Sequence, residues 1–254
     1  MLVFRLLVVS FVFAASAAFA QDYPRRPVRL VVPFASGGPT DIAGRILARV
    51  MQERLGQPVV VENKTGAAAV AGTDFVAKSP NDGYTVLLGT IAHTITPALY
   101  KTLPYDPVKD FAPVAILMDD GPYIIGVHPS VPAKSARELI AMAKAKPGYL
   151  TYGSTGIGSG FHLAGELFQA LAKVKMTHVP FKGGAPAMLS LLQGESFTMF
   201  ANFLTALPQV REKRVRALGV TGLKRSTLAP DIPTVDESGL RGFEVEQTYS
   251  VVTA

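Results

Sequence analysis

The sequence of 254 residues contains no cysteine and only four histidines. Without cysteine the chain cannot form a disulfide bond, a thiolate nucleophile or a cysteine-based metal site. The histidines, His93, His128, His162 and His178, show no ligand spacing such as H-E-x-x-H, so we expect neither a metal nor another cofactor. Beyond the N-terminal segment no stretch is apolar enough to cross a bilayer, so we expect no membrane span.

The sequence also lacks a convincing set of catalytic residues. The acidic pairs Asp119–Asp120 and Asp236–Glu237 fall in loop-like sequence and are typical of solvated turns. Ser159 precedes His162 by about one helical turn, which imitates a Ser–His pair, but no third member can be assigned. We therefore expect a protein that is not an enzyme. A secreted serine hydrolase using these two residues is the alternative.

Neither sign of charge is in large excess, because 25 Lys and Arg residues face 19 Asp and Glu residues, for a formal net charge of +6. The basic residues are scattered, apart from residues 211–216. That run is more typical of a solvated helix end than of a nucleic-acid surface, so we expect no nucleic-acid partner. A mildly basic protein attracts anionic solutes only weakly at physiological salt.

Residues 1–20 are typical of a secretory signal peptide. They hold a single basic residue, Arg5, then an apolar stretch, and they end in Ala18-Phe19-Ala20, an A-x-A cleavage pattern. An uncleaved anchor is the alternative. Export combined with the absence of disulfides suits a bacterial periplasm.

Residues 28–55 predict a buried strand, a glycine-rich turn and a helix. The strand covers residues 28–32, Gly37 and Gly38 allow a tight turn, and Pro39 suits the first helical turn. Ile42, Ile46, Leu47, Val50 and Met51 form the expected apolar face of the helix, which Gly56 ends. The free N–H groups of such a helix start make an anion site, although most turns of this kind bind nothing.

Residues 150–163 repeat this pattern, with a helix beginning near Ser159. Two similar helix starts, one in each half of the chain, can point into one cleft. Strands expected at 59–62 and 84–89 complete an α/β pattern of mostly parallel sheets, in which ligands bind beyond the carboxyl ends of the strands. Helices are also expected at 68–78, 135–146, 185–192, 204–213 and near 235, and strands at 111–117, 123–128, 176–179, 196–200, 215–221 and 243–252.

Six motifs occur in an order that resembles the periplasmic solute receptors of tripartite tricarboxylate transporters, the Bug-type receptors. They are PFASGGPTD (33–41), VENKTG (61–66), DGYTVL (82–87), YGSTGIGS (152–159), VPFKGGAP (179–186) and DIPTV (231–235). The resemblance runs from about Pro24 to the end. It implies a type II periplasmic-binding-protein fold of two α/β lobes joined by a hinge, near residues 119–123 and 220–223. It also implies a monomer that binds a small carboxylate between the lobes and delivers it to membrane permease subunits.

The resemblance further implies which residues hold the ligand. The first βα loop and its counterpart in the second lobe would bind carboxylates, mostly through backbone N–H groups. The expected ligand-binding residues are Phe34, Ser36, Gly37, Gly38, Thr40, Asp41, Thr90, Ser154, Thr155, Gly156, Gly158, Ser159, His162 and Asn202.

The expected domain organisation is a signal peptide (1–20), a first lobe (21–120), a second lobe (121–221) and a return to the first lobe (222–254). Relatives of this kind continue with a further strand and helices. The resemblance therefore implies that the first lobe is incomplete, and a truncated product without function is a second alternative.

Overall fold

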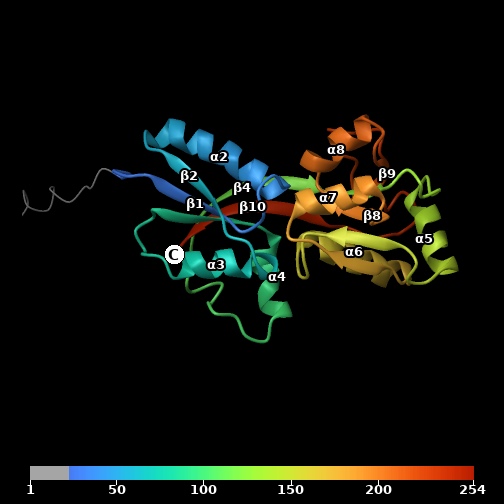
Figure 1. The fold of residues 1–254 in the computed structure, drawn as a ribbon, viewed down its shortest axis with the longest axis horizontal. Helices are drawn as coiled ribbons and strands as arrows, with labels where there is room; N and C mark the ends of the chain where they lie inside the picture. Colours follow the sequence, from blue (N-terminus) through green and yellow to red (C-terminus); the bar gives the residue numbers. More distant parts are fainter. Residues whose placement is uncertain (1–22) are drawn as a thin grey trace, which may run out of the picture.

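The computed structural model describes residues 23–254, so the predicted signal peptide lies outside the described residues. The described chain forms two five-stranded sheets that lie end to end, each flanked by helices (Figure 1). This is the mixed α/β architecture that the sequence predicts. We call the elements around the first sheet the first lobe and those around the second sheet the second lobe.

The first sheet has the strand order β2-β1-β3-β10-β4. Its strands are β1 (Val28–Val32), β2 (Val59–Asn63), β3 (Thr85–Gly89), β4 (Ala112–Pro122) and β10 (Glu246–Thr253). Its helices are α2 (Pro39–Leu55), the 3₁₀ turn η2 (Ala67–Ala69), α3 (Val70–Ala77) and α4 (Ile91–Leu99). Every residue of β3 is buried, as expected for a strand covered on both faces.

The second sheet has the strand order β7-β6-β8-β5-β9. Its strands are β5 (Ile124–Val127), β6 (Thr151–Ser154), β7 (Thr177–Pro180), β8 (Thr198–Ala201) and β9 (Arg216–Val220). Its helices are α5 (Ala136–Ala145), α6 (Gly160–Ala172), α7 (Gly184–Gln193) and α8 (Phe203–Arg211). The side chain of Ser135 caps α5 by accepting the Glu138 amide at 3.2 Å, as the sequence predicts.

In each sheet four strands run in one direction and one strand is reversed. β10 pairs antiparallel with β3 and β4, and β5 pairs antiparallel with β8 and β9, whereas the other pairings are parallel. Both reversed strands reach their sheet from the other lobe. β4 continues into β5 through Tyr123, and β10 follows a long segment after β9. Four of the five strands in each sheet therefore run in the same direction, which is the mostly parallel arrangement that the sequence predicts.

The segments that pass between the lobes are hydrogen-bonded to one another at Thr221. Its hydroxyl accepts the Tyr123 amide at 2.7 Å and donates to the Val245 carbonyl at 2.5 Å, and its own amide donates to the Tyr123 carbonyl at 2.9 Å. Ala229, Val235, Leu240 and Phe243 pack in the core of the second lobe. The return to the first lobe, expected at residue 222, therefore falls later, at β10.

The sequence predicts only part of the buried face of α2, because Leu47 and Met51 pack on the core but Ile46 and Val50 do not. Ile46 and Val50 are about half exposed, at 50% and 46%, and Leu47 packs on the core beside the buried Ala48. The reason is Gly44, because a Cβ at this position would stand 2.7 Å from the Val32 side chain. The helix comes closest to the sheet where it has no side chain, which turns the large residues beside it outward.

Two further elements differ from expectation. α4 was not predicted, because Pro97 lies inside it and weakens the helical signal. No helix forms near residue 235. There Thr234 and Glu237 cap each other's amides at 3.0 and 2.9 Å, but the turn does not extend, and Gly239 follows with a φ of 100°.

Candidate functional site

Four helices begin around one point between the lobes. α2 and α4 belong to the first lobe and have Gly38 and Thr90 as N-caps, and α6 and α7 belong to the second lobe and have Ser159 and Gly183. The first N–H groups of a helix have no partner within the helix, and its macrodipole is positive at this end. The arrangement therefore gathers hydrogen-bond donors and positive potential in one place.

The two lobes touch at the starts of α2 and α7. A Cβ built on Gly184 would stand 2.4 Å from Cδ of Pro39, and one built on Gly38 would stand 3.3 Å from the Gly184 nitrogen. Only glycine permits this approach of the two backbones. The contact fixes how closely the lobes come together.

A small cavity of about 20 Å³ lies at the meeting point. Its lining comes from both lobes and contains no charged side chain: Phe34, Gly38, Pro39, Thr40, Thr90, Thr155, Ser159, Gly160, Phe161, Gly184, Gln247 and Tyr249. The volume holds about one water molecule, so a larger group enters only if the lobes separate slightly.

A larger cavity of about 480 Å³ shares Phe34 and Thr155 with the small one and is also lined by both lobes. Its other lining residues are Pro33, Thr65, Gly66, Ala67, Ala68, Ala69, Tyr100, Gly156, Ile157, Pro180, Phe181 and Lys182. The walls are mainly apolar, and Lys182 is the one charged residue among them. The two cavities together suit a small molecule with a polar head and an apolar body.

The first glycine-rich loop is held by Asp41, which is only 2% exposed. Its carboxylate accepts the Gly37 amide at 2.9 Å, Nε of Arg45 at 2.9 Å and Nδ2 of Asn63 at 3.0 Å. Burial alone would raise the pKa of Asp41, but these hydrogen bonds and the Arg45 charge hold the pKa below its usual value. Asp41 therefore fastens the loop as a carboxylate whose charge is offset by Arg45.

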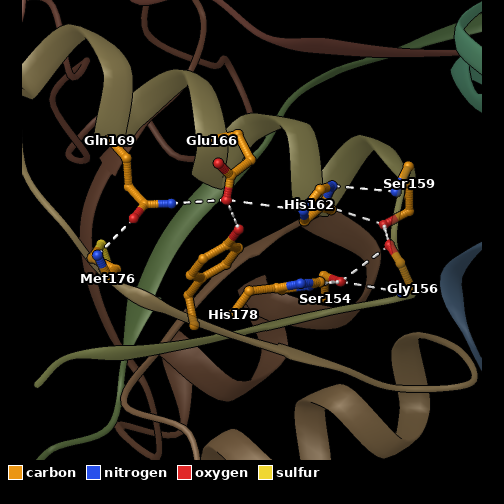
Figure 2. A network of polar contacts seen from close by, with 10 residues as sticks. Ser154, Gly156, Ser159, His162, Glu166, Gln169, Met176 and His178 are labelled. Carbon is orange, nitrogen blue, oxygen red and sulfur yellow. Dashed lines mark hydrogen bonds and ion pairs between the residues drawn. The ribbon is translucent and has the colours of Figure 1, made fainter. Parts of the chain in front are cut away.

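The second glycine-rich loop is held by a polar network from β6, β7 and α6, which Figure 2 shows. The Ser159 hydroxyl donates to the Gly156 carbonyl at 2.7 Å and accepts the His162 amide at 3.3 Å. The Ser154 hydroxyl accepts the Gly156 amide at 3.1 Å and lies 2.6 Å from Nε2 of His178. Gly156 and Gly158 have φ of 120° and 87°, which explains the need for glycine.

Behind the loop Nδ1 of His162 accepts the Gly158 amide at 3.2 Å, and Nε2 lies 3.9 Å from Glu166. The Tyr152 hydroxyl donates to the same carboxylate. Burial lowers the pKa of His162, and burial with the neighbouring His162 lowers the pKa of His178 to about 4. Burial and the Glu166 carboxylate raise the pKa of Tyr152 far above its usual range. Both imidazoles are therefore neutral at pH 7.

The structure separates thirteen of the fourteen expected binding residues into two groups, and Asn202 lies apart from both. Seven line the two cavities: Phe34, Gly38, Thr40, Thr90, Thr155, Gly156 and Ser159. Six others lie in or behind the loops that carry these residues: Ser36, Gly37, Asp41, Ser154, Gly158 and His162. Asn202 is the N-cap of α8, where its side chain bonds Thr205.

Several lining residues were missed by sequence reasoning. Gly184 begins α7 as the last residue of Phe-Lys-Gly-Gly (181–184), which is the same glycine-rich signal as in the two predicted loops. Gln247 comes from β10, which reaches the site only because the chain returns to the first sheet. The resemblance implies that return, but no local pattern shows which residues of the strand face the site.

The arrangement does not support the serine hydrolase alternative. The Ser159 hydroxyl is directed to the Gly156 carbonyl, and Nδ1 of His162 is occupied by the Gly158 amide. The two side chains therefore do not form a nucleophile and base pair. Among residues 23–254, no cluster of three or more His, Cys, Asp and Glu side chains is placed to hold a metal ion. In the same part of the chain no helix is long and apolar enough to span a bilayer.

Two α/β lobes around a cavity at four helix starts define a two-lobed solute-binding protein of the periplasmic-binding-protein class. The chain belongs to the tripartite tricarboxylate transporter family receptors, known as TctC, whose family pattern it matches over residues 43–254. Proteins of this family are solute receptors rather than enzymes.

Three similar proteins show the extent of the likeness. BugT of Bordetella pertussis is 38% identical over 255 aligned residues, which cover 98% of this chain and 78% of BugT. Rpa4515 of R. palustris, solved with adipate, has a TM-score of 0.88 and 37% identity, covering 91% of this chain and 77% of Rpa4515. MatC of Rhodopseudomonas palustris, solved with bound malate, has a TM-score of 0.86 and 35% identity, covering 91% of this chain and 79% of MatC.

Proposed function

We propose that this protein captures a small organic acid between its two lobes in the periplasm and delivers it to the membrane permease of a tripartite tricarboxylate transporter. The observation that carries the proposal is the convergence of four helix starts on one cavity without a charged side chain in its lining. Such a site favours an anion through backbone donors and helix macrodipoles. The ligands of Rpa4515 and MatC, adipate and malate, are both small dicarboxylates.

The carboxylate head enters the small cavity while the lobes are apart, and the lobes then close on it. Each helix start contributes about 0.3–1 kcal/mol, and more where water is excluded. Thr90 and Ser159, which each carry a hydroxyl, lie in the same lining and are 8% and 1% exposed. The body of the ligand extends into the larger cavity, where Lys182 attracts a second carboxylate.

We propose the two lobes as moving parts, with the hinge at the crossing segments that meet at Thr221. Ligand binding closes the lobes by a small rotation taken up there. The domain limits proposed from the sequence, 21–120 and 121–221, place the hinge in this same region, and β10 adds a strand of the first lobe after it. We further propose cleavage after Ala20 and a monomeric receptor.

The test is calorimetric titration of the chain lacking residues 1–20 with malate, adipate, succinate and acetate, together with the uncharged diamide of succinate. We expect one dicarboxylate to bind with a micromolar or lower Kd and the diamide not to bind. Thermal melts run in parallel detect binding as a rise in Tm. If none of the acids binds or shifts the melt while the protein is folded, the proposed function is wrong.

A further inference from the structure

His162 lies directly behind the glycine-rich turn that presents the second-lobe side of the site (Figure 2). Its Nδ1 accepts the Gly158 amide at 3.2 Å. A nitrogen that accepts an N–H carries no proton, so this contact requires the neutral ring with its proton on Nε2. Nε2 faces the Glu166 carboxylate at 3.9 Å. The contact with Gly158 therefore exists only while His162 is uncharged.

Gly158 is a sensitive point of the turn. It precedes Ser159, the N-cap of α6, and has a φ of 87°. Ser159 and the next two residues line the small cavity, so a shift of the Gly158 peptide moves cavity-lining groups directly. A Cβ on Gly158 would also approach a Leu99 side-chain atom of the first lobe to 2.9 Å, so the turn lies where the lobes meet.

The groups that face His162 come from three elements. Glu166 is on α6, Tyr152 is on β6 and His178 is on β7, with the two imidazole rings 4.3 Å apart and the Tyr152 ring 6.5 Å from His162. The Glu166 oxygen nearest His162 already accepts the Tyr152 hydroxyl and Nε2 of Gln169 at 2.9 Å. The side chain of His162 is only 16% exposed. If His162 were protonated, the negative charge facing it would be the Glu166 carboxylate, which Tyr152 and Gln169 already use as a hydrogen-bond acceptor.

We propose that His162 is a positioning residue that makes carboxylate affinity depend on pH. The neutral ring holds the Gly158 amide and with it the start of α6 in the geometry that binds the ligand. When Nδ1 is protonated, two N–H groups face each other, the turn moves away from the ring, and the ligand is released. This inference rests on the proposed function and adds to it the condition under which the site releases its ligand.

The environment sets the direction of the effect. Burial lowers the pKa of His162 from its ordinary value, and Glu166 only partly opposes this. The proton therefore binds more readily to the form with the turn displaced than to the ligand-binding form. Affinity is full above the ordinary histidine pKa of about 6.5 and falls as the pH drops below it.

Two substitutions separate the acceptor from the charge. In His162→Asn, Oδ1 stands where Nδ1 stands in histidine, so the acceptor for Gly158 is kept but cannot be protonated at these pH values. His162→Leu removes the acceptor at every pH. His128→Asn is the control, because that ring bonds Ser130 at 2.7 Å on a loop outside the site. Glu166→Gln removes the counter-charge.

Kd is measured by calorimetry with malate or adipate, whichever binds, between pH 7.5 and 5.5. Because the ligand's own titration is common to every variant, the comparison among variants decides. On going from pH 7.5 to pH 5.5, the wild type and His128→Asn should lose affinity. We expect this loss to be larger than the loss in His162→Asn by a factor of about five or more. His162→Leu is weaker than wild type already at pH 7.5, and Glu166→Gln moves the loss to lower pH. If His162→Asn loses affinity on acidification as the wild type does, the inference is wrong.

A second measurement needs no ligand, so that failure of the inference and of the proposed function can be told apart. In NMR spectra of the ligand-free protein, the Gly158 amide shift should follow the titration of the His162 ring with the same midpoint. A Gly158 amide that does not change across the His162 titration overturns the inference even if carboxylates bind.

Discussion

Replacing Gly184 by alanine tests whether contact between the lobes governs ligand affinity. The added Cβ would stand 2.4 Å from Cδ and 3.2 Å from Cγ of Pro39, so both near contacts belong to the other lobe. Pro39 is a rigid ring in the first turn of α2 and cannot swing aside. Carbon atoms pack at about 3.5–4.0 Å, so the lobes must stay about 1 Å further apart.

The magnitude follows from the cost of overpacking. Forcing one extra methyl group into a packed contact costs about 1–3 kcal/mol. Since about 1.4 kcal/mol corresponds to a factor of ten, Kd for malate or adipate should rise about 5- to 140-fold. We expect the closed, ligand-bound form to keep this contact and an opened form to lose it, so the cost should fall on the bound form. The Tm of the ligand-free protein should therefore change little.

Gly44→Ala is the matched control. Its Cβ would meet the Val32 side chain at 2.7 Å inside the first lobe, so it strains the open and closed forms alike and should lower Tm with and without ligand. Calorimetry and thermal melts on both variants separate the two effects. If Gly184→Ala binds as tightly as the wild type, close approach of α2 and α7 is not part of the bound state. If it lowers Tm without weakening binding, Gly184 serves folding alone.

Three further outcomes follow from the same geometry. Thr90→Ala and Ser159→Ala each remove a hydroxyl that caps a helix at the cavity. Each should weaken binding by about 0.5–1.5 kcal/mol in calorimetry. If neither changes the affinity, these hydroxyls do not contact the ligand. Lys182→Ala should weaken dicarboxylates more than acetate, which the same titrations detect, and equal losses would place Lys182 away from the second carboxylate. The free energy of unfolding, measured with urea, should be constant above about pH 6.5 and fall by about 1–2 kcal/mol toward pH 4, because the folded state holds the pKa of His178 near 4. This magnitude is smaller than the full pKa shift would give, because solvent screens a partly exposed group. A His178→Gln variant that loses as much stability in acid as the wild type would contradict this.

The sequence predicts the strand–turn–helix units well because their signals are local. The start of α2 follows from Gly38 and Pro39, and the start of α6 follows from Ser159, which caps it. The end of α2 follows from Gly56, which adopts a φ of 67°. Each of these features depends on the conformational limits of one or two residues, so neighbouring sequence is sufficient to predict it.

Long-range placement is what the sequence could not supply. Gly184 faces Pro39 across the two lobes although the residues are far apart in the chain, and Gln247 reaches the cavity through the return of β10. The partners of His162 have the same origin, since His178 meets it only when β7 pairs with β6. A helical pattern also fails to show which residue comes closest to the sheet, and this residue is Gly44 in α2.

The absence of a charged side chain from the small cavity bears on how such a receptor can both hold and release an acid. A buried arginine or lysine would bind a carboxylate strongly, but it would also leave an uncompensated charge whenever the ligand departs. Helix starts avoid this cost, because water satisfies the same N–H groups when the lobes separate. The one carboxylate in the first loop, Asp41, is offset by Arg45 and so does not repel the ligand. Affinity then depends on bringing the N–H groups of four helix starts together. For this reason we expect a large effect from a single methyl group between α2 and α7, and from one proton on His162 behind the second glycine-rich loop.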